Sequence, residues 1–168
     1  YTEADDLIRK LAMAFADGVN YIEIASNDAD ILNLSDLPNV KQPQAKMPSN
    51  VNSADELNLY KTLVGDSSDN LKGLAGFGDA AWSRLTENQR KNIHLALQQD
   101  MDSFLPTLAF DLEDKKDSKL VDKLNEHWAT LKMYWTVVNY IDIPDEDLLK
   151  SLRSYPKQQL VQPNVPVM

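Results

Sequence analysis

The stretch that decides how this sequence is interpreted is Gly65-Asp66-Ser67-Ser68-Asp69-Asn70-Leu71-Lys72-Gly73-Leu74-Ala75-Gly76-Phe77-Gly78. Two carboxylates stand three residues apart, and a lysine and three glycines in a G-x-x-G-x-G pattern follow them. Carboxylate oxygens are the ligands that hard divalent cations prefer. Glycines let backbone N–H groups approach a phosphate closely. The stretch therefore predicts a metal-binding loop joined to a phosphate-binding loop.

The composition limits the possible classes of protein. A length of 168 residues suits one domain, or one domain with a subdomain, and is enough to bury a core. The absence of cysteine excludes disulfides and thiolate metal sites and fits a reducing cytoplasm. No apolar run is long enough to span a membrane, so we expect no membrane partner.

The net charge of −9 argues against a protein that coats DNA, because such proteins are normally basic. Two explanations of the acidity remain open. It can be a solubility feature of the whole surface. Alternatively, the carboxylates are concentrated at a metal site, and their placement along the chain has to decide.

Acidic residues gather at the start of the first predicted helix, over residues 2–17. The apolar residues of this helix recur with the i, i+3, i+4, i+7 spacing. Glu3, Asp5 and Asp6 lie in its first turn, on or near one face. Acids also favour the positive end of a helix for electrostatic reasons alone, and this alternative stays open.

A second acidic pair follows a predicted strand over residues 19–25. The chain runs from this strand directly into Asp28 and Asp30. Helix, strand and polar turn form a piece of an α/β sheet, whose ligands bind beyond the carboxyl ends of the strands. In the alternative interpretation Asp28 caps a following turn and Asp30 is solvated. Residues 37–49 hold three prolines and predict a loop with a short edge strand.

From about residue 50 onward the pattern is helical. Capping boxes begin helices at Ser53 and Thr86, and Asp79 is expected to cap a helix between them. A long helical run is predicted over residues 118–138, and a last helix after Pro144. Aromatic residues of these helices are expected in the core. The tail from residue 156 is expected to be extended and mobile.

Seven carboxylates share a placement at a helix start, a strand exit or an interhelical loop: Glu3, Asp5, Asp6, Asp28, Asp30, Asp66 and Asp69. If they converge, each close pair costs up to about 4 kcal/mol at an effective dielectric constant near 20. Cations relieve that repulsion. Because Mg²⁺ keeps several waters, this many acids predicts two ions, Mg²⁺ or Mn²⁺. Two neighbouring metals are the arrangement used for in-line phosphodiester hydrolysis.

Three motifs together resemble the signature of the structure-specific 5′-nucleases. These motifs are Glu3-Ala4-Asp5-Asp6, Ser26-Asn27-Asp28-Ala29-Asp30, and Gly65 to Asn70 followed by the three glycines. The family comprises flap endonucleases, the 5′-nuclease domains of bacterial DNA polymerases and bacteriophage ribonuclease H. The resemblance covers about residues 2–98, and a weaker likeness to the phage members continues at residues 137–144.

The resemblance implies a fold as well as a site. It implies that residues 1–50 are the C-terminal part of a PIN-like α/β core with a mostly parallel sheet, and that residues 51–168 form a helical region. The helical region would contain a helix–three-turn–helix module at about residues 57–98. All seven acids would be metal-binding and catalytic, the first three at one ion and the other four at the second. The implied contacts to duplex backbone are Lys72, Gly73, Gly76, Gly78 and Arg84, with K⁺ at the glycine hairpin.

The implied activity is that of a two-metal 5′-3′ exonuclease or flap endonuclease in DNA replication and repair, with ribonuclease H activity on hybrids. The implied partners are branched or nicked duplex DNA, RNA–DNA hybrids and replication proteins. We expect a monomer in the cytoplasm of a bacterial or phage-infected cell. Two alternatives remain: a non-catalytic module that binds duplex DNA through the hairpin, and an acidic α/β scaffold whose spacing is fortuitous.

This sequence departs from the family pattern in two places. Family members carry further aspartates and a basic arch ahead of the Glu-Ala-Asp-Asp motif, so we expect a segment to precede Tyr1 and the metal site of this chain to be incomplete. The family also has a lysine just after the last hairpin glycine, where this chain has Asp79. Contacts to phosphate would then fall to the basic residues nearby, Lys72, Arg84, Arg90 and Lys91.

Overall fold

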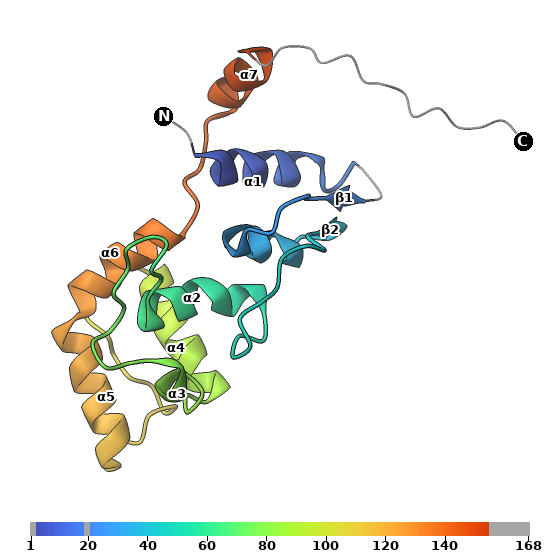
Figure 1. Cartoon of the computed structure of the whole chain (residues 1–168). Helices are drawn as coiled ribbons and strands as arrows, with labels where there is room; N and C mark the ends of the chain where they lie inside the picture. Colours follow the sequence, from blue (N-terminus) through green and yellow to red (C-terminus); the bar gives the residue numbers. More distant parts are fainter. Residues whose placement is uncertain (1–2, 19–20, 155–168) are drawn as a thin grey trace, which may run out of the picture.

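A computed structural model describes residues 3–18 and 21–154 of the chain, which is mixed α/β and about half helical (Figure 1). The elements are α1 (Ala4–Phe15), β1 (Ile22–Glu23), the 3-10 helix η1 (Ala29–Asp36), β2 (Val40–Lys41), α2 (Ala54–Val64), α3 (Asp79–Trp82), α4 (Glu87–Gln98), α5 (Lys115–Glu126), α6 (Trp128–Val138) and α7 (Asp145–Ser154). None of the helices in these ranges has the length and apolar character needed to cross a bilayer.

The sheet consists of β1 and β2, which pair in parallel with Ile22 opposite Val40. The connection between them contains η1, and α1 packs with η1 over a small core around Ile24 and Val40. This sheet is consistent with the predicted α/β class; a larger PIN-like sheet stays a prediction. The strand predicted over residues 19–25 is formed only at Ile22–Glu23, and residues 19–20 lie outside the described residues.

The strand is short because the chain turns directly after it. Ile24 still donates its N–H to Lys41 of β2, at 2.8 Å, but Ser26 then donates its N–H back to Ile24, at 3.0 Å. That local hydrogen bond ends the extended conformation. The paired strand therefore ends at Glu23, two residues earlier than the sequence predicts.

The second half packs α2 to α6 around a larger core. Trp82 is completely buried there, and its indole N–H donates to the carbonyl of Asn50 at 2.6 Å. Its ring meets that of Tyr60 edge to face. Trp82 is thus a core residue, as expected. Trp128 is also buried and donates to the carbonyl of Met101 at 2.8 Å.

Two predicted helix boundaries in this half are wrong. The run predicted over residues 118–138 breaks at His127, between α5 and α6, where the indole of Trp128 is held in the core by its hydrogen bond to Met101. Gly78, not Asp79, is the N-cap of α3, and Asp79 instead accepts a hydrogen bond from the Tyr60 hydroxyl.

The capping boxes have different outcomes. The box at Thr86 and Gln89 is complete, with Thr86 accepting from the Gln89 N–H at 3.2 Å. At Ser53 the side chain makes no capping bond, and Glu56 accepts from the N–H of Asn52 at 3.2 Å instead. Both helices still begin where the sequence predicts.

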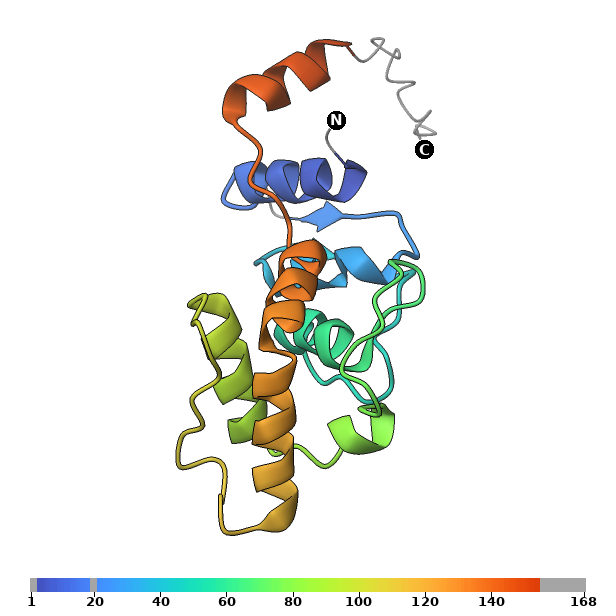
Figure 2. The ribbon, with the colours of Figure 1, turned by 90° about the vertical axis from the view of Figure 1, so that its left-hand side faces the viewer.

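Contacts in several places join the halves. Leu32 of η1 packs with Val51 and with Leu57 of α2 in a small shared cluster. Farther along the chain, the segment after α6 passes beside η1 and α1 before it reaches α7 (Figure 2). Both strands precede residue 50 and helices α2 to α7 follow it, while a division into two domains stays a prediction.

Candidate metal centre

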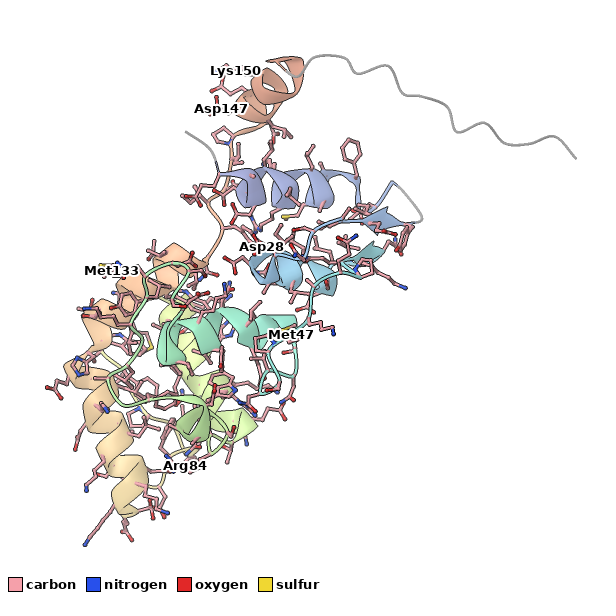
Figure 3. The ribbon with its side chains drawn as sticks, viewed as in Figure 1. Asp28, Met47, Arg84, Met133, Asp147 and Lys150 are labelled. Carbon is pink, nitrogen blue, oxygen red and sulfur yellow. The ribbon has the colours of Figure 1, made fainter. Side chains whose placement is uncertain are left out.

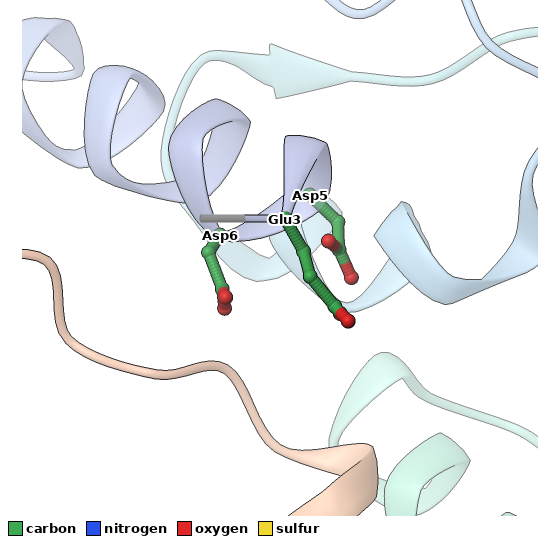
Figure 4. A group of neighbouring side chains, drawn as sticks. All are labelled: Glu3, Asp5 and Asp6. Carbon is green, nitrogen blue, oxygen red and sulfur yellow. The ribbon is translucent and has the colours of Figure 1, made fainter. Parts of the chain in front are cut away.

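Glu3, Asp5 and Asp6 form the first acidic group, which we call the helix-start group. Glu3 is the N-cap residue of α1 and the two aspartates lie in its first turn. One carboxylate oxygen of each lies within 4.8 Å of the others. Figure 4 shows the three side chains pointing to the same side of the helix start. Asp6 is buried and accepts a hydrogen bond from the N–H of Ile141 at 2.8 Å.

Asp30, Asp66 and Asp69 form the second acidic group, which we call the loop group. Their carboxylate oxygens also lie within 4.8 Å of one another. Asp30 belongs to η1, whereas the other two lie in the loop after α2. Tertiary structure thus brings together acids that are distant in the sequence.

Glycines shape the loop that carries two of these acids. Asp66 and Leu71 exchange backbone hydrogen bonds of 2.9 and 2.8 Å, which closes the loop on itself. Gly65 and Gly73 adopt positive φ angles of 100° and 65°. A Cβ atom on Gly73 would lie 2.5 Å from the carbonyl carbon of Val64, so the loop could not pack on the end of α2. The packing of the chain itself therefore explains a glycine at position 73.

A lysine that sequence reasoning missed lies inside the loop group. The Lys61 ammonium forms ion pairs with Asp30 and with Asp66, the latter at 2.9 Å. Its side chain is only 9% exposed. A signal existed in the sequence: Leu57, Lys61 and Val64 share the i, i+4, i+7 face of a helix, which puts a lysine on an apolar face. Such a lysine needs an acidic partner.

The environment shifts the pKa values of this group in opposite directions. Burial raises the pKa of Asp66, but hydrogen bonds from Ser68 and the Lys61 ammonium outweigh it and hold the pKa below its usual value. Burial, together with the Asp30 charge, raises the pKa of Asp69. Burial lowers the pKa of Lys61, but its two acidic partners outweigh this and the pKa is raised. The lysine therefore stays charged, and it neutralises part of the group.

Both groups line one pocket of about 490 Å³. Its walls include all three acids of the helix-start group and, from the loop group, Asp30 and Asp69, with Lys61 beside them. Asp66 lines an adjoining pocket of about 480 Å³, which shares Asp30 and Lys61 with the first. Six carboxylates from three segments of the chain are thus arranged around one concave region.

Asp28 has a different position. Its carboxylate accepts the N–H of Asp30 at 3.0 Å and caps η1. It lies outside both sets of mutually close carboxylates, although it lines the adjoining pocket. The capping alternative therefore describes Asp28 correctly. Its second part does not hold, because Asp30 is ion-paired with Lys61 rather than simply solvated.

The segment after α6 holds the two groups together, and sequence reasoning did not assign it this role. The hydroxyl of Tyr140 lies 3.0 Å from the carbonyl of Asp30 and 2.6 Å from the Asn33 side-chain oxygen. Asn58 of α2 donates to the Asn139 side chain at 3.0 Å. Burial, and then the carboxylates of the pocket, raise the pKa of Tyr140. Its hydroxyl thus remains a hydrogen-bond donor at neutral pH.

The donor set of the pocket fits a hard divalent cation. All the ligand atoms on offer in the two groups are carboxylate oxygens, which suit Mg²⁺ or Mn²⁺ better than softer metals. Among the described residues no basic side chain forms an ion pair with the helix-start group, so a cation there would displace none of their ammonium or guanidinium groups. At the loop group it would compete with Lys61.

The residues predicted to contact DNA lie on the helical half. Gly76, Gly78 and Arg84 are exposed, as is Lys72. Two other basic residues considered from the sequence are engaged elsewhere. Arg90 pairs with Glu56 at 3.2 Å and lies over the Trp82 ring. Lys91 pairs with Glu87 at 2.5 Å. Arg90 and Lys91 line a pocket to which the glycine hairpin does not contribute.

Part of the chain is similar in sequence to a known protein. A curated protein named 5'-3' exonuclease, from Mycoplasmopsis pulmonis (strain UAB CTIP), is 35% identical over 96 residues, which are 51% of this chain and 32% of that protein. The chain thus covers about a third of the length of this relative. No known protein family profile and no solved structure matches the chain. The similarity supports a relationship to the 5′-nucleases and suggests a nuclease function.

Proposed function

We propose that this chain carries the metal centre of a divalent-metal-dependent 5′-nuclease. The proposed reaction is the hydrolysis of phosphodiester bonds at the 5′ ends of branched or nicked duplex DNA or of the RNA in hybrids. One observation carries the proposal: acids from the start of α1, from η1 and from the loop after α2 line one concave region. The 5'-3' exonuclease that shares 35% identity over half of the chain supports it.

The two groups would have distinct roles. The helix-start group would hold one ion, and Asp30, Asp66 and Asp69 the second. Ions held there would supply the activation of a water for attack on the phosphate and the stabilisation of the leaving 3′-oxygen. Asp28 fixes the turn that presents Asp30, and the Ile141 N–H fixes Asp6. In the absence of a second ion, the Lys61 ammonium would reduce the repulsion among the carboxylates of the loop group.

The test is metal-dependent cleavage of a 5′-labelled flap duplex and of an RNA–DNA hybrid, with Mg²⁺ and with chelator. Because the chain covers about a third of its relative, the protein as its gene encodes it is assayed beside the 168-residue chain. We expect cleavage to need Mg²⁺ and to fall at least about a thousandfold in an Asp66→Ala/Asp69→Ala variant. Unchanged cleavage by that variant would contradict the two-metal assignment.

A second candidate function is binding of duplex nucleic acid without cleavage. The observation that favours it is Lys61, which already supplies one positive charge to the loop group. This candidate predicts that both forms of the protein bind duplex and that neither cleaves it with Mg²⁺ or Mn²⁺. The nuclease proposal predicts cleavage by the gene-encoded form, so one assay separates the two.

A further inference from the structure

A groove of about 560 Å³ lies between the glycine hairpin and α5, on the helical half of the molecule. The hairpin contributes Gly76 to its wall, and α4 contributes Gln89. Four basic side chains line the groove: Arg84, Lys116, Lys119 and Lys123. Three of the four come from α5, so this cationic surface extends beyond the helix–three-turn–helix module predicted over residues 57–98.

The buried face of α5 determines where its lysines point. Val121 and Leu124 are buried in the large core. Lys116, Lys119 and Lys123 recur at i, i+3 and i+7 and therefore share another face of the same helix. Packing of the apolar face consequently turns the three lysines toward the groove.

The acidic residues in the groove are already engaged within the chain. Asp114 accepts the backbone N–H groups of Lys116 and Asp117, at 2.7 and 3.1 Å. Asp117 accepts from the Gln89 side chain at 3.0 Å and from the N–H of Asp111 at 2.9 Å. The four basic side chains, in contrast, form no ion pair with any residue that the structure describes. The groove is therefore locally positive in a chain of net charge −9.

The hairpin is open toward these lysines. Gly76 has a φ of 67°, and a Cβ atom on it would lie 3.5 Å from the Lys123 ammonium. A Cβ atom on Gly78 would have no atom within 4 Å. Lys123 thus brings a positive charge directly to the hairpin backbone. The residue after the last hairpin glycine, Asp79, does not supply such a charge.

The chemistry of the groove favours a duplex over a single strand. Proteins that bind single strands combine basic grooves with exposed aromatic rings on which bases stack. Among the described residues that line this groove, the one aromatic side chain is Phe77, which is only 6% exposed. A row of lysines beside glycines suits phosphates held in the regular geometry of a duplex backbone.

We propose that Arg84 and the α5 lysines, together with the open end of the glycine hairpin, form the phosphate-binding surface for duplex nucleic acid. The proposal deepens the proposed function by extending its duplex contacts to α5, and it rests on that function for the class of ligand. Lys119 and Lys123 each contact a phosphate, and Gly76 allows the backbone of the duplex to approach.

The test measures binding of a short fluorescent duplex to the 168-residue chain by anisotropy, in chelator, over a range of salt concentrations. The test variant is Lys119→Glu/Lys123→Glu. The control is Lys115→Glu/Lys150→Glu, which changes the net charge equally. Lys115 is exposed on α5 but does not line the groove. Figure 3 shows Lys150 at the opposite end of the molecule from Arg84.

We expect the test variant to bind the duplex about tenfold more weakly. The magnitude of the negative slope of log K against log salt should decrease by about 2, because each lost phosphate contact decreases it by about 0.9. The control should bind nearly as the unaltered chain does. A Lys119→Gln/Lys123→Gln variant, with its melting temperature measured, separates a loss of contacts from a loss of folding and should show a smaller change in the same direction.

Several outcomes would overturn the proposal: equal weakening in test and control, no weakening in either, tighter binding of single strands than of duplex, or competition by polyglutamate as effective as that by unlabelled duplex. Failure of the groove is distinguishable from failure of the nuclease. Asp66→Ala/Asp69→Ala should abolish cleavage and leave duplex binding in chelator unchanged. If that variant loses cleavage while the Lys119→Glu/Lys123→Glu variant binds duplex as the unaltered chain does, the phosphate-binding role of the groove is rejected and the nuclease proposal stands.

Discussion

The two acidic groups of the pocket are built in opposite ways. The helix-start group comes from four consecutive positions, residues 3–6, and has no basic partner among the described residues. The loop group joins η1 to the loop after α2 and contains the ammonium of Lys61. One group is local in sequence and uncompensated, and the other depends on tertiary structure and is partly neutralised.

This difference has consequences for cation binding. Repulsion among close carboxylates is relieved by whichever positive charge is nearest. At the helix start, no basic side chain of the described residues forms an ion pair with the acids. The positive end of α1 contributes about 0.3–1 kcal/mol for each acid. In the loop group, Lys61 has already supplied that charge. We therefore expect the helix-start group to bind a divalent ion more tightly.

The largest effect should come from removing helix-start ligands. Glu3→Gln/Asp5→Asn is expected to lower the affinity of the tight Mn²⁺ site by more than about a hundredfold, because direct ligands matter at least as much as the outer partners whose loss costs 10–100-fold. Mn²⁺ titration followed by electron paramagnetic resonance measures this. The charge-matched control is Asp17→Asn/Glu23→Gln. If the variant keeps its tight Mn²⁺ site, that site lies at the loop group, and the loop group rather than the helix-start group binds the ion more tightly.

The second effect tests the dependence of the loop group on tertiary structure. Gly73→Ala should lower the free energy of unfolding by about 3 kcal/mol, because its Cβ would meet the backbone at the end of α2. Gly76 has a similar φ, but a Cβ atom there would meet the flexible end of Lys123 at an ordinary contact distance of 3.5 Å, so Gly76→Ala should lower it by only about 1 kcal/mol. Urea unfolding measures both. Tight Mn²⁺ binding should persist in Gly73→Ala if the helix-start group is truly local.

The third effect concerns Lys61. Lys61→Met leaves two acids without their cation and should cost about 2 kcal/mol in the absence of metal, or a fall of about 4–8 °C in melting temperature. Saturating Mn²⁺ should restore most of it, since a ligand at 100 times its Kd stabilises by about 2.7 kcal/mol. The control is Lys132→Met, which removes an exposed pair with Asp100. If the metal dependence of the melting temperature is the same in Lys61→Met as in the unaltered chain, Lys61 does not compete with a cation.

The smallest effect involves an acid outside both groups. Backbone N–H groups of Asp117 and Lys116 hold the pKa of Asp114 below its usual value. A carboxylate with a lowered folded-state pKa stabilises the fold above its unfolded pKa and loses that contribution as the pH falls through the folded value. The stability difference between the unaltered chain and Asp114→Ala should therefore be full at neutral pH and vanish in acid. The melting temperatures of both proteins, measured from neutral to acidic pH with and without Mn²⁺, give this stability difference. If the difference depends on Mn²⁺, the placement of Asp114 outside both acidic groups is contradicted.

Sequence patterns predict the elements better than their partners. The positions of Glu3, Asp30 and Asp66 beside helix starts and loops follow from spacing and turn chemistry, which are local. The pairing of Lys61 with Asp30 is not local, since the two are 31 residues apart. The apolar face of α2 signals that Lys61 is buried, but not which acids receive it.

The break at His127 has a similar explanation. Residues 118–138 have a continuous helical pattern, and no glycine or proline lies within them. The helix divides because Trp128 is buried against Phe104 and donates to Met101, contacts that come from a distant segment. Local propensity is overridden by such packing, which no spacing within the helix reveals.

The segment after α6 also controls when the pocket can exist. The N–H of Ile141 bonds Asp6 across 135 positions, and the hydroxyl of Tyr140 reaches Asp30 across 110. Contacts of such long range form late, because a long loop must close before they are gained. During synthesis the chain is delivered from its N-terminus. The acids at residues 3–6 therefore emerge before Ile141 does, and Asp6 gains its hydrogen bond from Ile141 only once this later segment has been synthesised and has packed beside α1.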